Sequence, residues 1–181
     1  LRPSPSPGTR MRLAGESRNG VWLAEQGHVV TSVDYSEVGL RKARELAESR
    51  GVALATECID LTDWAPVANS LDAVVLIYTH LPAAIRQKTH RALAQGLRAG
   101  GWLILEAFHP QQLSYASGGP KDIDMLYTPE QLNADFDGLL TPVLAWHGET
   151  LLDEGPGHQG KAHVTRWMGQ YKDVSVGELR Q

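Results

Sequence analysis

Short apolar segments recur along the first 108 residues, and the stretches between them carry apolar residues at helical spacing. Five strands are predicted from these segments: Met11–Ala14, His28–Val33, Val52–Ile59, Leu71–Tyr78 and Trp102–Phe108. Leu71–Tyr78 is a continuous apolar run, which is typical of a strand buried on both faces of a parallel sheet. Met11–Ala14 is the weakest of the five, because two arginines interrupt its apolar residues.

Two helices are predicted between the first three strands. Arg18–Gln26 is followed by Gly27, a residue that commonly ends a helix in the left-handed conformation. Ser36 is predicted to cap a second helix that runs to about Arg50 and is ended by Gly51. The residues of this helix that share one face are Leu40, Ala43 and Ala47.

Two more helices are predicted further along the chain. The first begins with Pro82 as its first helical residue and ends at Gly100-Gly101. Its inward stripe consists of Ile85, Ala92, Leu93 and Leu97. The sequence Thr128-Pro129-Glu130-Gln131 forms a capping box, which predicts a short helix to about Phe136.

The alternation of strands and helices predicts an α/β fold, a Rossmann-like doubly wound and mostly parallel sheet. Val143–Leu152 and Lys161–Tyr171 flank a Gly-rich loop, so we expect an antiparallel hairpin at the end of this sheet. Between His109 and Tyr127 lies a polar connection whose length is typical of a functional or mobile segment.

Length and composition predict one domain over residues 13–172, preceded by a Pro- and Ser-rich leader, residues 1–12, and followed by a tail, residues 173–181. The net charge of −4 and the scattered basic residues argue against nucleic-acid binding. No apolar run approaches the length of a membrane helix, and residues 1–12 lack the apolar core of a signal peptide.

Cys58 is the single cysteine, so no internal disulfide can form, and a reducing cytoplasm is the expected compartment. Because Cys58 lies in an apolar strand-like segment, we expect it to be a buried, inert thiol.

Ligands of such sheets bind outside the carboxyl ends of the strands, near the point where the strand order reverses. Asp34 follows Gly15 by nineteen residues (34 − 15), close to the spacing of about twenty expected for a ribose-binding acid. The alternative for Asp34 is a loop carboxylate that caps the next helix. Asp60 is a candidate acceptor for an adenine amino group, or a strand-end acid that faces water. Arg18 and Asn19 are placed to orient a carboxylate or a phosphate, or simply begin a solvated helix.

Three histidines, His80, His109 and His158, fall at predicted strand ends or loops. An imidazole titrates near pH 6.5, so each is a candidate general base as well as a candidate surface residue. Their spacing specifies no metal site, and none is predicted. The other four histidines are expected to be structural: His28, His90, His147 and His163.

Several motifs together resemble the class I S-adenosylmethionine-dependent methyltransferases, in particular a small bacterial branch related to tellurite-resistance and thiopurine methyltransferases. The resemblance extends from Leu13 to Tyr171. The motifs that carry it are Gly15-Glu16-Ser17-Arg18-Asn19, Trp22-Leu23-Ala24, Val33-Asp34-Tyr35-Ser36, Tyr78-Thr79-His80-Leu81-Pro82, Ala99 to Glu106, and Gly118-Gly119-Pro120-Lys121-Asp122.

The resemblance implies a seven-stranded sheet whose last strand is antiparallel, with S-adenosylmethionine as the cofactor. Gly15 would contact the methionine part, Asp34 the ribose, and Asp60 with Leu61 the adenine, while Tyr78 and His80 would border the methyl group. The full set of candidate cofactor-binding residues is Ala14, Gly15, Glu16, Asn19, Asp34, Tyr35, Ser36, Asp60, Leu61 and Tyr78. The candidate catalytic residues are His80 and His109, and the candidate substrate residues are Arg18, Tyr115 and His158.

The function that follows is methyl transfer to a small-molecule acceptor by in-line displacement, with residues 109–127 forming a lid over the acceptor. The first motif departs from the family, because Ser17 stands where a glycine is expected and the upstream acid is absent. One alternative is therefore a noncatalytic Rossmann-like binding protein with a degraded cofactor site. A nicotinamide-dependent oxidoreductase is a further alternative, but Gly15, Ser17 and Gly20 do not complete the Gly-x-Gly-x-x-Gly motif.

Overall fold

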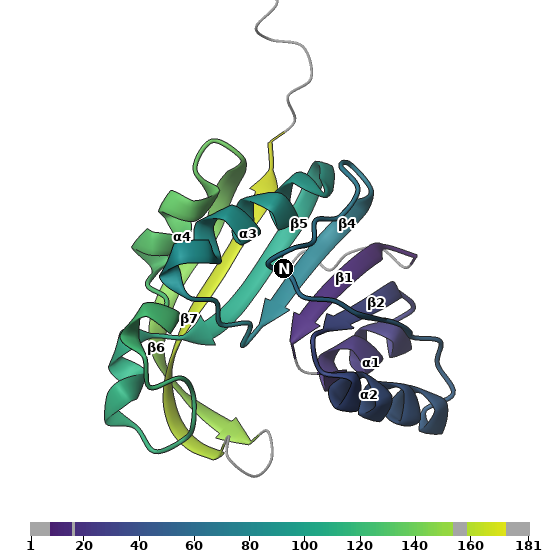
Figure 1. Cartoon of the computed structure of the whole chain (residues 1–181), viewed down its shortest axis with the longest axis horizontal. Coiled ribbons are helices and arrows are strands. Elements are labelled where there is room, and N and C mark those ends of the chain that lie inside the picture. The colour runs from purple at the N-terminus through teal and green to yellow at the C-terminus, as the bar shows by residue number, and fades with distance from the viewer. Residues whose placement is uncertain (1–7, 16, 154–158, 173–181) are drawn as a thin grey trace, which may run out of the picture.

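A single sheet of seven strands runs through the computed structural model, which describes residues 8–15, 17–153 and 159–172, without the side chains of residues 13–17. Its strand order is β3-β2-β1-β4-β5-β7-β6 (Figure 1). The strands are β1 Arg10–Gly15, β2 Val29–Asp34, β3 Ala55–Cys58, β4 Leu71–Ile77, β5 Leu97–Phe108, β6 Leu140–Asp153 and β7 Gln159–Tyr171. The first five pair in parallel, whereas β7 is antiparallel to both β5 and β6. The predicted fold class, including the antiparallel hairpin, is confirmed.

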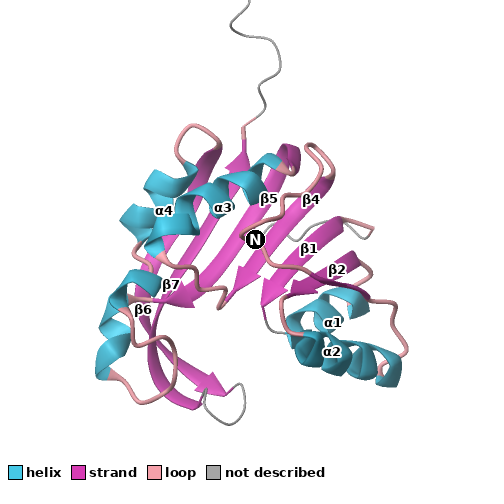
Figure 2. Cartoon of the chain, viewed as in Figure 1, coloured by secondary structure: helices cyan, strands magenta, loops and turns pink. Residues whose placement is uncertain are grey.

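Helices cover both faces of the sheet (Figure 2). They are α1 Ser17–Glu25, α2 Glu37–Ser49, α3 Ala83–Gln95 and α4 Pro129–Phe136, with the short 3₁₀ helices η1 Pro110–Ser114 and η2 Ile123–Met125. On one face, Leu93 of α3 and Phe136 of α4 pack against β4, β5 and the buried Trp167 of β7. On the other face, Leu23 of α1 packs against Val30 and Val75. The chain crosses from β1 to β2 on one side of the sheet's centre and from β4 to β5 on the other. Because both crossovers are right-handed, their helices cover opposite faces.

β1 is a central strand in spite of its weak pattern, because its second arginine is paired. The guanidinium of Arg12 donates two hydrogen bonds to the carboxylate of Glu57, at 2.7 and 3.0 Å. It also lies 4.7 Å from the ring centroid of Trp64. A charged side chain inside a sheet is tolerated when it is paired in this way. β1 begins at Arg10, within the range that the sequence assigns to a leader.

Several predicted helix ends are confirmed in detail. The hydroxyl of Ser36 accepts a hydrogen bond from Gly39 N, and Leu40, Ala43 and Ala47 are the buried residues of α2. Gly27 has a φ of 85°, as expected for a residue that ends a helix. Both hydrogen bonds of the predicted capping box at Thr128 and Gln131 are present.

Three expectations are wrong in their details. α3 starts one residue after Pro82 and ends at Gln95, and β5 already begins at Leu97, so Gly100-Gly101 lies within a strand. There Gly100 has a φ of 75°, and a Cβ on Gly101 would lie 2.8 Å from Arg98 O, so glycine is required for an irregular strand start. β3 spans only Ala55–Cys58.

Cys58 is exposed rather than buried, because β3 forms the edge of the sheet. Among the described residues, no helix is both long enough and apolar enough to cross a membrane.

Candidate functional site

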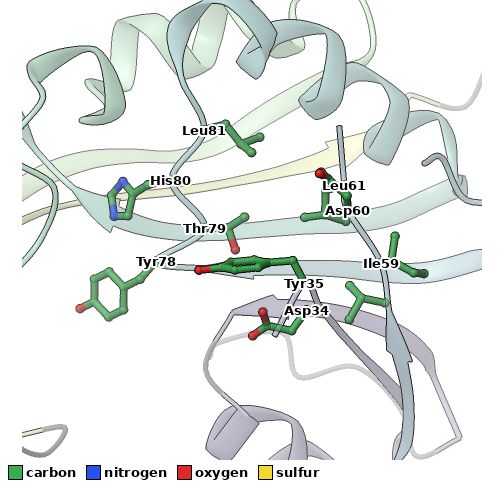
Figure 3. A pocket seen from close by; sticks show the side chains of 10 residues that line it. Asp34, Tyr35, Ile59, Asp60, Leu61, Tyr78, Thr79, His80 and Leu81 are labelled. Carbon is green, nitrogen blue, oxygen red and sulfur yellow. The ribbon is translucent and has the colours of Figure 1, made fainter. Parts of the chain in front are cut away.

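A pocket of about 370 Å³ lies beyond the carboxyl ends of β2, β3 and β4 (Figure 3). It is lined by Val33, Asp34, Tyr35, Ile59, Asp60, Leu61, Tyr78, Thr79, His80 and Leu81. Because β1 pairs with β2 on one side and with β4 on the other, this is the point at which the strand order reverses. The volume lies within the range of about 300 to 1,000 Å³ that is usual for small-molecule sites.

Asp34 ends β2, and its side chain lines the pocket. Its Oδ1 atom accepts a hydrogen bond from Ser36 N at 2.9 Å. The hydrogen bond that caps α2 is instead accepted by the hydroxyl of Ser36, from Gly39 N at 3.2 Å. The capping role considered for Asp34 therefore belongs to Ser36, which is not among the residues that line the pocket.

Asp60 follows the end of β3 and both lines the pocket and faces solvent. Its Oδ1 atom accepts hydrogen bonds from Thr62 N at 2.9 Å and from Thr62 Oγ1 at 2.8 Å. These two bonds lower the pKa of Asp60 below its ordinary value. The carboxylate is thus ionised at neutral pH and offers an acceptor to a ligand.

Tyr78 follows β4 with a φ of 51°, a left-handed conformation that is uncommon for a residue other than glycine. Its hydroxyl donates to Glu106 Oε1 at 2.7 Å, and Arg166 Nε donates to Glu106 Oε2 at 2.6 Å. The Tyr78 ring stacks on Phe108 at 4.7 Å and points away from Asp34 (Figure 3). Strained backbone of this kind costs about 1–3 kcal/mol and concentrates at ligand sites.

His80 lines the same pocket and is held in one orientation. Its Nδ1 atom lies 2.6 Å from Met125 O, and since a carbonyl only accepts hydrogen bonds, the ring proton resides on Nδ1. The Nε2 atom lies 3.5 Å from Phe108 N, a long contact. The basic lone pair of His80 is therefore on Nε2.

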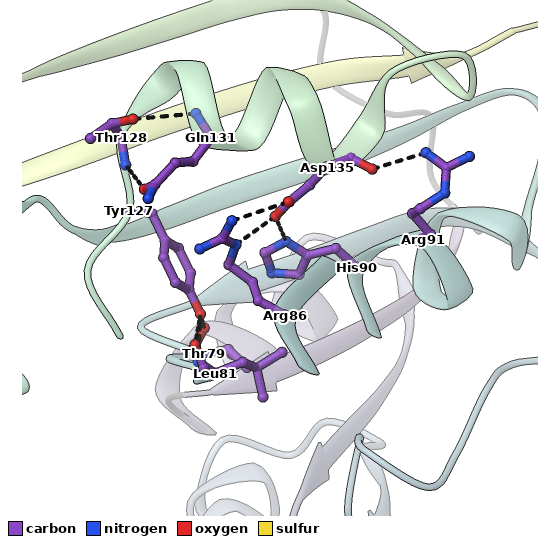
Figure 4. A network of polar contacts seen from close by, with 9 residues as sticks. All are labelled: Thr79, Leu81, Arg86, His90, Arg91, Tyr127, Thr128, Gln131 and Asp135. Atoms are coloured by element: carbon purple, nitrogen blue, oxygen red, sulfur yellow. Dashed lines mark hydrogen bonds and ion pairs between the residues drawn. The ribbon is translucent and has the colours of Figure 1, made fainter. Parts of the chain in front are cut away.

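Hydrogen bonds with the hydroxyl of Tyr127 hold the loop after β4 in place (Figure 4). The hydroxyl of Tyr127 accepts from Leu81 N at 2.5 Å and donates to Thr79 O at 3.2 Å. Burial raises the pKa of Tyr127 to about 12, so the hydroxyl keeps its proton. Thr79 and Leu81 both line the pocket, so Tyr127 sets the position of one pocket wall.

A second buried network joins α3 to α4 in the same region (Figure 4). Asp135 accepts from Arg86 Nε at 2.7 Å, from Arg86 Nη2 at 3.2 Å and from His90 Nδ1 at 2.8 Å. Burial alone would raise the pKa of Asp135, but the hydrogen bonds from His90 and Arg86 outweigh it and lower the pKa. Burial also lowers the pKa of His90, in spite of the Asp135 carboxylate, so His90 is a neutral donor. His90 is structural, as the sequence predicts.

The pocket contains six of the predicted site residues, and others lie elsewhere. Those in the pocket are Asp34, Tyr35, Asp60, Leu61, Tyr78 and His80. Those that are not among its lining residues are Arg18, Asn19, Ser36, His109 and Tyr115. For Ala14 and Gly15 only the backbone is described, at the end of β1 beside β4. Glu16 and His158 lie outside the described residues.

His109 and Tyr115 have other partners. The Nδ1 atom of His109 accepts from Gln111 N at 3.2 Å, and its ring stacks on that of His147 at 4.3 Å. The Tyr115 hydroxyl donates to Glu149 Oε1. The pocket also includes four residues not chosen as site candidates: Val33, Ile59, Thr79 and Leu81. Val33, Thr79 and Leu81 belong to motifs that carry the family resemblance, whereas for Ile59 the signal in the sequence is its position at a strand end.

Comparisons with known proteins find a similar domain family and similar folds. The model of a methyltransferase domain family matches residues 14–101, a stretch that begins in β1, includes every lining residue of the pocket and ends in β5. Residues 14–101 are therefore similar to a methyltransferase domain. No curated protein matches the chain.

Several solved structures share the fold of this chain over nearly its whole length. An S-adenosylmethionine-dependent methyltransferase from Methanosarcina mazei is similar with a TM-score of 0.73 at 16% identity, over 93% of this chain and 94% of that one. TehB from Haemophilus influenzae is similar with a TM-score of 0.70 at 18% identity, over 91% of this chain but only 58% of TehB. The [4+2]-cyclase SpnF is similar with a TM-score of 0.70 at 13% identity, over 94% of this chain and 76% of SpnF.

Proposed function

We propose that this domain binds S-adenosylmethionine in the pocket at the ends of β2, β3 and β4 and transfers the methyl group to a small-molecule acceptor. The observation that carries the proposal is the position of Asp34. Its carboxylate stands at the tip of β2, inside a pocket of about 370 Å³ at the point where the strand order reverses. A carboxylate at this place can accept hydrogen bonds from both hydroxyl groups of a ribose.

The remaining pocket residues fit the other parts of such a ligand. Ile59 and Leu61 offer apolar surface on either side of Asp60, as an adenine ring requires, and Asp60 adds an acceptor for its amino group. When bound, S-adenosylmethionine supplies an electrophilic methyl group on a sulfonium. The protein then has to orient the acceptor and exclude water, so positioning supplies most of the catalysis.

His80 is the pocket residue that we assign to the acceptor. An acceptor oxygen or nitrogen that carries a proton can pass it to Nε2 of His80 when Nε2 gives up its 3.5 Å contact with Phe108 N, since Nδ1 is held by Met125 O. A soft acceptor, such as a thiolate, needs no base. In either case the cofactor, held by Asp34 and Asp60, would supply the methyl group for an in-line displacement. His109 receives no role in this step, since it does not line the pocket.

Two alternatives compete with this proposal, and both can use the same fold. A noncatalytic binding protein is favoured by the incomplete first motif, and SpnF shows that a cyclase shares this architecture. A nicotinamide-dependent enzyme would use Asp34 in a similar way. Ligand choice and product formation therefore have to decide between them.

The test is a titration of the purified chain with S-adenosylmethionine, S-adenosylhomocysteine and NADH, followed by calorimetry. We expect saturable binding of the two adenosyl ligands, loss of that binding in Asp34→Ala, and no heat from NADH. Asp153→Ala removes an exposed carboxylate from the end of β6 and serves as the matched control. Binding should be unchanged in this control.

A folded chain that binds neither adenosyl ligand contradicts the proposal, and binding of NADH alone favours the oxidoreductase. If the adenosyl ligands bind, the chain is incubated with labelled cofactor and a panel of thiols, amines and oxyanions. Label transfer to one class of acceptor supports methyl transfer, whereas binding with no transfer to any of them favours a binding protein.

A further inference from the structure

Three histidines from separate parts of the chain meet beyond the end of β5. His109 directly follows β5, His147 lies in β6 and His163 lies in β7. The ring centroids are 4.3 Å apart for His109 and His147, 4.9 Å for His109 and His163, and 5.2 Å for His147 and His163. One ring nitrogen from each of the three lies within 4.8 Å of the other two.

The backbone under this cluster is tied together by hydrogen bonds between these elements. His109 N donates to His163 O at 3.0 Å, and His163 N donates to Gln112 Oε1 at 2.7 Å. The other end of the Gln112 amide donates to Ser117 Oγ at 2.9 Å. In the hairpin of β6 and β7, Glu149 is the partner of His163. His147 lies two residues before Glu149 on the same face of β6, so it is the diagonal neighbour of His163. The three imidazoles therefore stand on a fixed frame.

The distances suit a small cation with nitrogen ligands. His147 Nδ1 and His163 Nε2 lie 2.9 Å apart and share a proton. A tetrahedral zinc ion with nitrogen ligands at about 2.0–2.1 Å places those nitrogens roughly 3.3–3.4 Å from one another. The observed range, from 2.9 Å to at most 4.8 Å, includes this value, so shifts on the order of 1 Å would complete the site.

The surroundings of the cluster also suit a cation. The carboxylates of Glu130 and Glu149 lie close enough to add negative potential at His109 and His163 respectively.

We propose that His109, His147 and His163 bind one divalent transition-metal ion of the zinc class, with the fourth position open to water or an exchangeable ligand. Three histidines with an open position form a familiar ligand set for zinc. The ion would join the end of β5 to both strands of the hairpin. This proposal does not depend on cofactor binding, because none of the three residues lines the pocket.

Metal binding by this cluster requires protons to move between the nitrogens of the histidine rings. The proton that lies between His147 Nδ1 and His163 Nε2 has to move to the other nitrogen of the ring that carries it. That ring then changes its tautomer, and no net proton is released. His109 now accepts from Gln111 N through Nδ1. If it binds the metal through Nε2, it gives up this 3.2 Å contact, so we expect the start of η1 to respond to the metal.

The test uses the full chain without a histidine tag, stripped with a chelator and titrated with Zn²⁺ by calorimetry and with Co²⁺ by visible absorption. We expect one ion per chain, a tetrahedral Co²⁺ spectrum, and a rise in melting temperature on metal addition. The His147→Ala variant should weaken binding by at least 100-fold. Because His147 is exposed, this variant is expected to fold normally.

His163→Gln is a second variant at a buried ligand position, and it should show the same loss if circular dichroism confirms its fold. His28→Ala, at a histidine just before β2, is the matched control and should bind like the unchanged chain. No saturable binding, or binding that survives in His147→Ala, would overturn the proposal. Neither result bears on adenosyl ligands, whose titration is performed separately on the metal-free chain.

Discussion

The pocket rim, which consists of Asp34–Ser36 and Asp60–Thr62, differs from the anchored segment, residues 109–136, in the range of its contacts. Both rim carboxylates bond to a residue two positions along the chain, Ser36 or Thr62. The anchored segment instead bonds to residues more than 40 positions away, as Tyr127 does to Leu81, Gln112 to His163 and Asp135 to Arg86. The rim is half-buried or exposed, while Tyr127 and Asp135 are almost fully buried.

Because of this difference, we expect the pocket rim to determine ligand binding and the anchored segment to determine the stability of the fold. Carboxylates held only by local contacts near solvent can exchange water for a ligand with little change elsewhere in the fold. Buried long-range contacts cannot be lost without leaving an unpaired polar group, which costs about 1–3 kcal/mol or more. The connection from His109 to Tyr127, although polar and long, therefore packs as part of the domain. Substitutions in the two regions should have opposite consequences.

The largest effect is expected for Asp135→Ala. It leaves Arg86 and the buried His90 without their carboxylate, and breaking a buried pair costs about 3–5 kcal/mol. For a chain of this size, about 1 kcal/mol lowers the melting temperature by about 2–4 °C, so a decrease of roughly 6–20 °C is expected in calorimetry. Asp60→Ala, at an exposed rim carboxylate, should change the melting temperature little. Equal effects of the two substitutions would remove the distinction between the regions.

Asp34→Ala should show the reverse behaviour. Hydrogen bonds to a charged group contribute about 1.5–3 kcal/mol each, so the loss of the two bonds that Asp34 would accept from the ribose should weaken S-adenosylhomocysteine binding by about 100-fold or more. The melting temperature without ligand should stay close to that of the unchanged chain. Calorimetric titration and a thermal scan of the same sample measure both quantities. A large thermal effect with unchanged affinity would mean that Asp34 is structural.

A smaller effect is expected for Gly119→Ala, which tests how the anchored segment supports the pocket. The φ of Gly119 is +88°, and an added Cβ would lie 2.7 Å from the ring of Phe108, on which Tyr78 stacks. Overpacking of this kind costs about 1–3 kcal/mol. Gly138→Ala is the control, because Gly138 has a φ of +77° but open space around it. The difference between their unfolding free energies from urea titration isolates the clash, and we expect Gly119→Ala to be the less stable.

The smallest effect concerns the pH dependence of stability. Because burial lowers the pKa of His90, the unfolded chain takes up a proton below about pH 6.5 that the folded chain does not. Stability should therefore fall as the pH decreases from 7 to 5, by at most about 1.4 kcal/mol per pH unit from this residue. The groups that face His90 are Asp135, Arg86 and Tyr127. Asp135 acts in the same direction at lower pH, since its pKa is also lowered.

His90→Phe keeps a ring between Tyr127 and Phe136 but removes the titrating group. Melting temperatures measured from pH 7 to pH 5 should decrease less steeply in this variant than in the unchanged chain. A parallel decrease in both would exclude His90 as a source of the pH dependence.

Local chemistry was predictable from the sequence. Ser36 and Thr128 cap the helices that their patterns predict, and the spacing from Gly15 to Asp34 places a carboxylate in the pocket. These features depend on residues a few positions apart, or on the period of one strand and one helix. The boundary between α3 and β5 was not predictable in the same way, because Leu97 continues the apolar pattern of the helix although it pairs with Leu71.

By itself, then, the sequence determined the order of the strands and helices, the fold class and the two carboxylates of the pocket rim. Only the tertiary structure decided that Arg12 is paired inside a central strand, that Cys58 lies on an exposed edge, and that three distant histidines form one cluster. The reason is physical: periodicity and capping depend on neighbours along the chain. Pairing across a sheet depends on register between strands that are tens of residues apart, and no local pattern encodes that register.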